Sequence, residues 1–355
     1  MVGYGKYIFL KEKVLPIYIT YFVTSRCNLK CQHCFYWESL NAIRDELSLE
    51  EVEKFSKTIG KPLVLSLTGG EPFLRKDLGK IVKIFYKNSK PKIVSIVTNG
   101  YFTKNCLKVV KDILFSCKFI SLIVELSIDG LEGEHNSIRL SNNSFKKALS
   151  TFKALKKLKL KYRNFNIGVI TTFSSINQYK MKEIMLFIKK NLNPDSFTIS
   201  LIRGDSKNKV IKNIDIEQYR KVVTLKNKIF KSGYNNFSLS SLKAANDSLI
   251  EDIVYKVLKY RKFQTPCYAA SLNSIISPSG DVLGCEILNN KIGNMRDFDY
   301  DFRKLWFTKE RADISSNIIK NKCFCTHECN ISVNTMFNVR HYPKLALKLA
   351  EGVMK

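Results

Sequence analysis

The chain has 355 residues and a formal net charge of +28, from 59 Lys and Arg against 31 Asp and Glu. This length allows one large domain and one small one, and the absence of an apolar run of about 18 residues argues against a membrane-spanning segment. The N-terminus also lacks the apolar core of a signal peptide. Ten cysteines, eight of them in two sequence groups, indicate a reducing compartment rather than a disulfide framework, so we expect a cytoplasmic protein.

Apolar runs alternate with helical patterns from residue 17 to residue 231. The first helix begins with a capping box, Ser48 to Glu51, in which the two side chains satisfy free backbone N–H groups. The strands are expected at 17–23, 63–67, 93–97, 120–128, 166–172 and 196–201, and the helices at 48–60, 77–88, 103–115, 144–158, 178–190 and 215–231. Six successive β/α units predict an α/β fold, an open (β/α)6 partial TIM barrel with helices outside a parallel sheet.

Three cysteines follow the first expected strand: Cys27, Cys31 and Cys34, at C-x3-C-x2-C spacing. An iron–sulfur cube has four corners, which proteins usually fill with thiolates. Three close cysteines without a local fourth leave one iron open, as catalytic metal sites leave a position for their ligand. A three-cysteine zinc site is the alternative, and the regular spacing argues against unrelated buried thiols.

A second signature lies one strand and helix later. Tyr36 follows the cysteines, and Gly69, Gly70 and Glu71 end the second expected strand within a Thr-Gly-Gly-Glu-Pro run. Glycine permits close backbone approach to a ligand. Together the two motifs resemble the radical S-adenosylmethionine (SAM) superfamily. This resemblance implies a catalytic [4Fe-4S] cluster on the three cysteines, SAM bound at its open iron, and cleavage of SAM to a 5′-deoxyadenosyl radical by an electron from flavodoxin or ferredoxin.

Polar residues at the carboxyl ends of the strands are expected to contact SAM, because ligands gather there in such sheets. The resemblance implies that Glu71 binds the SAM amino group and that Ser127 and Asp129 approach the ribose. It also implies that Arg139 clamps the carboxylate and that the segment around Arg203 lies near the methionine and adenine. A turn-forming Asp129 and a surface role for Arg139 are the alternatives. The expected SAM-binding residues are Tyr36, Gly69, Gly70, Glu71, Asn99, Ser127, Asp129 and Arg139.

The second cysteine group begins with a C-x12-G-x4-C pattern from Cys267 to Cys285 and continues with Cys323, Cys325 and Cys329. It resembles the auxiliary-cluster extension of SPASM and twitch radical SAM enzymes. A zinc ribbon, the alternative, usually shows C-x2-C pairs, and this stretch has none. The resemblance implies one auxiliary iron–sulfur cluster on Cys267, Cys285 and Cys329, with Cys323 or Cys325 as the fourth ligand. A second, incompletely ligated cluster stays open as a further alternative.

These patterns suggest four parts of the chain. We expect a radical SAM barrel at 1–232, a bridging helical linker at 233–265, an auxiliary-cluster domain at 266–340 and a basic tail at 341–355. The linker contains a helix at 249–262, after a boundary rich in Ser, Asn and Gly at 232–241. The tail is amphipathic and is expected to pack on the barrel as a closing helix.

The sequence therefore predicts a radical SAM oxidoreductase that abstracts hydrogen to modify a peptide or protein oxidatively. An alternative is a biosynthetic enzyme acting on a small molecule such as a tetrapyrrole, a sugar or aminocyclitol, a nucleotide or a cofactor precursor. A more remote one is a non-catalytic iron–sulfur or nucleic-acid-binding protein. The positive charge is dispersed over several helices, so the sequence favours neither a nucleic acid nor a membrane as a partner.

Overall fold

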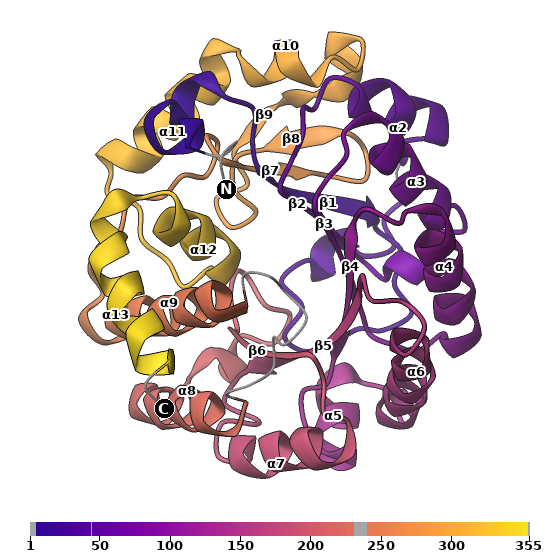
Figure 1. The fold of residues 1–355 in the computed structure, drawn as a ribbon, viewed down its shortest axis with the longest axis vertical. Helices are drawn as coiled ribbons and strands as arrows, with labels where there is room; N and C mark the ends of the chain where they lie inside the picture. The colour runs from indigo at the N-terminus through magenta and orange to yellow at the C-terminus, as the bar shows by residue number, and fades with distance from the viewer. Residues whose placement is uncertain (1–4, 44, 231–239, 354–355) are drawn as a thin grey trace.

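The computed structural model describes residues 5–43, 45–230 and 240–353. At its centre, six strands pair in parallel in the order β6-β5-β4-β3-β2-β1. The strands are β1 (Tyr18–Thr24), β2 (Val64–Gly69), β3 (Ile93–Thr98), β4 (Ser121–Ser127), β5 (Phe165–Phe173) and β6 (Ser196–Leu201). Helices surround them on the outside (Figure 1): α2 (Leu49–Ser56), α3 (Leu78–Asn88), α4 (Thr103–Ser116), α6 (Ser144–Lys159), α7 (Met181–Asn191) and α8 (Ile216–Ile229). This arrangement confirms the predicted α/β fold with six β/α units.

Side-chain burial alternates along the strands and distinguishes the face of the sheet under the helices from its inner face. In β4, Leu122, Val124 and Leu126 are fully buried, whereas Ile123 and Glu125 between them are partly exposed. Successive strand side chains point to opposite faces, so the fully buried set packs under the helices. The helix starts also follow the sequence: the Ser48 hydroxyl accepts from the Glu51 N–H and the Glu51 carboxylate from the Ser48 N–H, which confirms the capping box.

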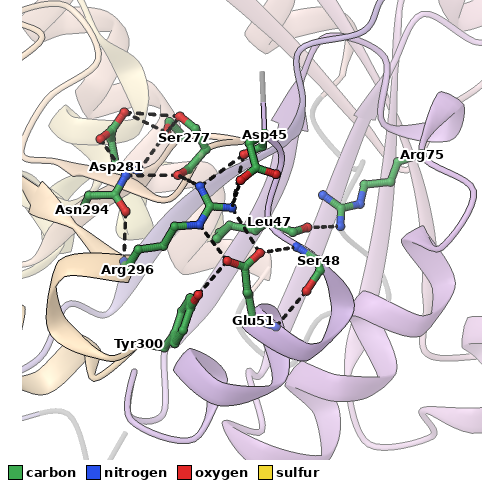
Figure 2. A network of polar contacts seen from close by, with 11 residues as sticks. Asp45, Leu47, Ser48, Glu51, Arg75, Ser277, Asp281, Asn294, Arg296 and Tyr300 are labelled. Atoms are coloured by element: carbon green, nitrogen blue, oxygen red, sulfur yellow. Dashed lines mark hydrogen bonds and ion pairs between the residues drawn. The ribbon is translucent and has the colours of Figure 1, made fainter. Parts of the chain in front are cut away.

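The C-terminal part continues the same sheet. Strand β7 (Asn273–Ile276) pairs in parallel with β1, β8 (Asp281–Leu283) pairs antiparallel with β7, and β9 (Lys291–Asn294) pairs antiparallel with β8. The described residues thus form one nine-stranded sheet. Strands β7 and β8 form a hairpin whose turn spans residues 277–280. Figure 2 shows how the residues after β9 are tied to the start of α2, where Arg296 and Tyr300 converge on Glu51.

Five helices belong to the C-terminal part of the described chain: α9 (Ser240–Tyr260), α10 (Phe302–Trp306), α11 (Lys309–Lys320), α12 (Glu328–Met336) and α13 (Tyr342–Val353). A short helix, α1 (Lys6–Phe9), lies near the N-terminus. Helices α12 and α13 pack on α9 (Figure 1). The closing helix expected in the tail is therefore present, although it packs on α9. None of the described helices is both long and apolar enough to span a membrane.

Two helices differ from the expectation. Helix α5 (Glu132–Arg139) was not predicted, because its buried face carries His135 and Arg139 beside Ile138 and so lacks an apolar periodicity. Helix α9 begins at Ser240 rather than at 249. Asn246 explains the longer helix, since it bonds to Ser332 and Thr335 of α12 at 3.2 and 2.6 Å. Most of the boundary expected at 232–241 lies outside the described residues.

Candidate active site

The first cysteine group lies in the loop after β1. Its thiols, on Cys27, Cys31 and Cys34, are free and partly exposed, and the Cys34 N–H donates to the Cys31 carbonyl oxygen at 3.2 Å. Burial raises the pKa of Cys27 to about 12, and the charges of Cys31, Glu71 and Cys34 act in the same direction. The three thiols therefore lie within electrostatic reach of one another, next to Glu71.

Hydrogen bonds hold this loop in place from two directions. The Asn41 side chain accepts from the Cys27 N–H at 2.9 Å and donates to the Cys27 carbonyl oxygen at 3.1 Å. In the loop after β6, the Lys207 N–H donates to the Cys34 carbonyl oxygen at 3.2 Å. Because β1 and β6 stand at opposite ends of the six β/α strands, the cysteine loop after β1 reaches the loop after β6 across the carboxyl ends of the strands.

Gly69 and Gly70 allow the ends of β1 and β2 to meet. A Cβ atom at Gly70 would lie 2.1 Å from the Arg26 carbonyl oxygen, and one at Gly69, whose φ is +113°, would lie 2.5 Å from that of Thr24. No side chain fits such distances, so both positions require glycine. Their expected contact with SAM stays a prediction.

Glu71 is 1% exposed and ties together the ends of β2 and β3. Its Oε1 accepts from the Thr98 hydroxyl at 2.7 Å and the Phe73 N–H at 3.1 Å, while its Oε2 accepts from the Asn99 N–H at 2.8 Å. Burial raises the pKa of this carboxyl, and the three hydrogen bonds oppose that change. A carboxylate has about four acceptor sites, so Glu71 has room for one further donor such as an amino group. The Asn99 side chain donates to Asn28 of the cysteine loop at 3.0 Å.

Asp129 and Arg139 form a buried ion pair beside the cysteine loop. The Arg139 Nε and Nη2 atoms lie 2.8 and 2.7 Å from Asp129 Oδ2, and Asp129 Oδ1 accepts from the Thr172 N–H at 2.8 Å. Burial opposes ionisation of Asp129, but Arg139, His33 and His135 lower its pKa to about 2. The two charged groups thus bind each other, and contact of either with SAM stays a prediction.

Other polar and aromatic groups lie at the same edge of the sheet. Ser127 is the last residue of β4 and is nearly buried, and the ring of Tyr36 packs edge-on against Phe22 with centroids 4.9 Å apart. His33 was not predicted, although it lies inside the cysteine motif. Its Nε2 is 4.0 Å from Asp129 Oδ2, and its buried Nδ1 has no hydrogen-bond partner within the described residues.

The second cysteine group gathers between the β7–β8 hairpin and the segment before α12. Burial raises the pKa of Cys267 to about 12, with further effects from Cys325, Cys285 and Cys323. These four thiols therefore lie near one another. Sequence reasoning left open whether Cys323 or Cys325 is the fourth ligand, and the structure brings both thiols near Cys267. Which of them are ligands stays a prediction.

Cys329 stands in the first turn of α12, where its thiol interacts with Tyr18 of β1 and with His327. The next residue, Asn330, reaches back to the second group, since its Nδ2 lies 3.8 Å from the Cys285 sulfur. Cys329 therefore lies where the first turn of α12 meets β1, and its expected role as a cluster ligand stays a prediction.

Charged residues next to these cysteines were not predicted. Burial disfavours ionisation of Glu286, but His327 and Arg203 lower its pKa to about 2. Burial likewise opposes protonation of His327, yet Glu286 raises the pKa of the imidazole to about 10. Arg203 Nε donates to this carboxylate at 2.9 Å, and the expected place of its segment near the methionine and adenine stays a prediction. Position next to cysteines in the sequence could have indicated these charged residues, because Glu286 follows Cys285 and His327 lies between Cys325 and Cys329.

The donor atoms of the first loop are three free thiols carried by one short segment. In the part of the chain that the structure describes, no group of three His, Cys, Asp or Glu side chains is arranged to hold one metal ion. Three thiols with a buried carboxylate within electrostatic reach are a donor set that an iron–sulfur cluster with one open position would fit. Fold and site together thus define an α/β barrel protein with a loop of three free cysteines at the carboxyl ends of its strands.

Comparison with known proteins agrees with this class. Residues 21–188 match the family model described as the Radical SAM superfamily. This part of the chain is therefore a radical SAM domain, as the two motifs predicted. It is 26% identical over 330 residues to the antilisterial bacteriocin subtilosin biosynthesis protein AlbA of Bacillus subtilis (strain 168). That alignment covers 88% of this chain and 66% of AlbA, so the chain spans just under two thirds of its relative.

Solved structures share the fold of nearly the whole chain. Native anSMEcpe with bound AdoMet superposes with a TM-score of 0.61 at 16% identity, covering 96% of this chain and 97% of that one. Streptococcus suis SuiB bound to the precursor peptide SuiA gives a TM-score of 0.61 at 17% identity, covering 88% of this chain and 70% of SuiB. The shared fold therefore extends beyond the barrel into the C-terminal, cysteine-rich region.

Proposed function

We propose that this chain is an enzyme that cleaves SAM reductively and oxidises a peptide or protein substrate. The observation that carries the proposal is the loop of three free thiols at the end of β1, fixed beside the buried carboxylate of Glu71. A site with three thiolates and an open fourth position is suited to binding a reactant. Family membership supports the chemistry, and the second cysteine group supports the oxidative outcome.

In this proposal Cys27, Cys31 and Cys34 hold a [4Fe-4S] cluster. The chemistry that this cluster supplies when bound is the one-electron cleavage of SAM to a 5′-deoxyadenosyl radical, which takes hydrogen from the substrate. Glu71 accepts a hydrogen bond from the SAM amino group at its remaining acceptor site. The other residues proposed to position SAM at the strand ends are Tyr36, Gly69, Gly70, Asn99, Ser127, Asp129 and Arg139.

The second cysteine group is proposed to hold at least one auxiliary iron–sulfur cluster. Its candidate ligands are Cys267, Cys285, Cys323, Cys325 and Cys329. The chemistry that such a cluster supplies when bound is acceptance of the electron left after product formation, which makes the net reaction an oxidation. The buried setting of Cys267 and Cys285 excludes water, as a redox centre that must not leak electrons requires.

A peptide or protein substrate is supported by what similar proteins are named for. SuiB was solved with its precursor peptide, and AlbA is named for biosynthesis of a bacteriocin. The barrel (1–232), linker (233–265), auxiliary-cluster region (266–340) and tail (341–355) are proposed as the working parts. Ten free cysteines support action in the reducing cytoplasm, with flavodoxin or ferredoxin as the electron source.

Iron and acid-labile sulfide per chain, after anaerobic reconstitution, test the cofactor proposal. Wild type is expected to hold about eight irons, and a Cys27/Cys31/Cys34→Ala variant about four. Replacement of Cys106 and Cys117, which are buried in and after α4, provides the matched control and should leave the iron content unchanged. A triple variant that retains the full wild-type iron content would contradict the assignment of the first loop.

Substrate class needs a second assay. Reduced, reconstituted protein should release 5′-deoxyadenosine from SAM, and a peptide encoded beside this gene should lose about 2 Da per oxidation when the two are co-expressed. Release of 5′-deoxyadenosine without any change in peptide mass would favour the small-molecule alternative. Absence of SAM cleavage by iron-loaded protein would refute the enzymatic proposal as a whole.

A further inference from the structure

Arg203, just after β6, contacts side chains from three distant segments. Its Nε donates to Glu286 Oε1 at 2.9 Å and its Nη1 lies 3.6 Å from Glu328 Oε2. Its guanidinium carbon stands 5.1 Å from the centre of the Phe35 ring, within the range of a cation–π contact. The side chain is only 20% exposed, so one partly buried cation is shared by two carboxylates and an aromatic ring.

The two carboxylates have further partners that close the network. His327 Nε2 lies 2.8 Å from Glu286 Oε1. Glu328 Oε1 accepts from the Leu201 N–H at 2.7 Å, and its Oε2 accepts from the Ser200 hydroxyl at 3.2 Å. Two cationic side chains therefore face two anionic ones, and the end of β6 is bonded directly to the start of α12.

Three partners of Arg203 are direct neighbours of cysteines in the sequence, and a fourth, the Ser200 hydroxyl, accepts from its Nη1 at 3.1 Å. Phe35 follows Cys34 of the first group. Glu286 follows Cys285, and Glu328 precedes Cys329, both of the second group. The packing against Phe35 is close, because a Cβ atom at Gly204 would lie 2.9 Å from the Phe35 Cβ. Arg203 and the adjacent Gly204 therefore contact residues that adjoin both cysteine groups.

We propose that Arg203 is a positioning residue that couples the two cysteine groups, so that the geometry of each depends on the other. The planar guanidinium suits this part, since its donors are fixed relative to one another and its face can stack on a ring at the same time. Lysine offers a point charge and cannot keep all of these contacts. The description of both groups as cluster sites rests on the proposed function, whereas the coupling itself is a property of the protein.

Arg311 supplies a matched control. It lies 5.7 Å from the Trp306 ring centre, donates from Nε to the Trp306 carbonyl oxygen at 3.0 Å and pairs with Glu12. Its side chain is 5% exposed. Arg311 thus has the same combination of aromatic ring and carboxylate, but none of these partners adjoins a cysteine.

Hydrogen exchange of the iron-free protein, followed by mass spectrometry, tests the coupling. Arg203→Met should speed exchange by about tenfold next to both cysteine groups, because the loss of a buried cation eases local opening. The peptides that report this are 27–38 for the first group, and 284–290 and 323–331 for the second. Arg311→Met should speed exchange only around 12 and 306–311. A change in Arg203→Met that is confined to 198–206, or to one cysteine group, would overturn the proposal.

Two further variants guard against a general loss of structure. Arg203→Met/Glu286→Gln should exchange more slowly than Arg203→Met alone, because it removes the buried carboxylate that has lost one of its two cationic partners. Arg203→Lys should give an intermediate increase in both groups, and no increase in either would count against the coupling. Should Arg203→Met fail to fold, Arg203→Lys decides the question by the same peptides.

Reconstituted protein adds a spectroscopic readout. Arg203→Met should alter the electron paramagnetic resonance signals of both reduced clusters, and Arg311→Met should alter neither. Unchanged signals in Arg203→Met would contradict the coupling. Wild type that binds no iron would instead refute the proposed function, and the exchange experiment would still decide on Arg203.

Discussion

Replacement of Glu51 by Gln should loosen the contact between α2 and the segment after β9. Glu51 Oε1 accepts from Arg296 Nε at 2.7 Å and from the Tyr300 hydroxyl at 2.8 Å, and Oε2 accepts from the Ser48 N–H at 2.7 Å (Figure 2). The Glu51 side chain is 15% exposed and that of Arg296 is 29% exposed. Glutamine keeps the size of the side chain but removes the charge that binds the guanidinium.

The cost follows from the bonds that lose their charged acceptor. A hydrogen bond to a charged group contributes roughly 1.5–3 kcal/mol, but partial exposure of Arg296 screens its share and the contributions of neighbouring bonds do not add fully. We therefore expect Glu51→Gln to lower the free energy of unfolding by about 2 kcal/mol at pH 7. Glu53→Gln on the same helix is the control, because Glu53 only forms an exposed pair with Lys87 at 3.7 Å, and it should cost less than about 0.5 kcal/mol.

The pH dependence gives an independent check. Burial of Glu51 opposes ionisation, but the hydrogen bonds from Arg296, Ser48 and Tyr300 lower its pKa to about 2, below the value of about 4.3 in an unfolded chain. The stability that ionised Glu51 adds is therefore present above pH 4.3 or so and is lost as the pH falls toward 2. The difference between wild type and Glu51→Gln should shrink over that window.

Urea unfolding of the iron-free protein, followed by circular dichroism at pH 7 and at pH 3, measures these differences. Wild type, Glu51→Gln and Glu53→Gln are compared at each pH. Equal midpoints for wild type and Glu51→Gln at pH 7 would refute the reasoning. A difference of the same size at both pH values would show that the loss does not come from the charge on Glu51.

Two other substitutions test the site. Gly70→Ala should lower the free energy of unfolding by about 3 kcal/mol, because its Cβ would lie 2.1 Å from the Arg26 carbonyl oxygen and overpacking forces the backbone apart. The same variant should bind less iron at the first loop. Gly133→Ala in α5 is the control: nothing lies within 4 Å of a Cβ there, so it should be neutral or stabilising in the same urea and iron assays. Asp129→Asn leaves the buried Arg139 guanidinium without its counter-charge. The free energy of unfolding in urea should therefore fall by about 3 kcal/mol. A decrease below about 0.5 kcal/mol would show that the pair is not needed for folding.

Much of the barrel could be predicted because its strands are short apolar runs separated by amphipathic helices. The capping box before α2 and the cysteine motif after β1 are local patterns and appear in the structure where the sequence places them. Helix α5 was missed for a physical reason: polar His135 and Arg139 occupy its buried face because they bind Asp129 rather than an apolar core.

Long-range pairings could not be predicted from the sequence. Arg203 and Glu286 are 83 positions apart, and nothing local indicates which carboxylate an arginine will meet. The same holds for β7, whose four residues carry no sign that they will pair with β1. For the cysteines, spacing identified both groups, whereas the approach of Cys323 and Cys325 together to Cys267 depends on how the segment before α12 folds.

The position of β1 in the sheet has a consequence for biosynthesis. Strand β1 is bonded to β2 on one side and to β7 on the other, yet β7 begins only at Asn273. While the chain emerges from the ribosome, one edge of β1 stays unpaired for the time needed to translate some 250 further residues. Open strand edges promote association between chains. We therefore expect that the region that matches the superfamily, 21–188, does not fold on its own and that fragments ending before Asn273 aggregate.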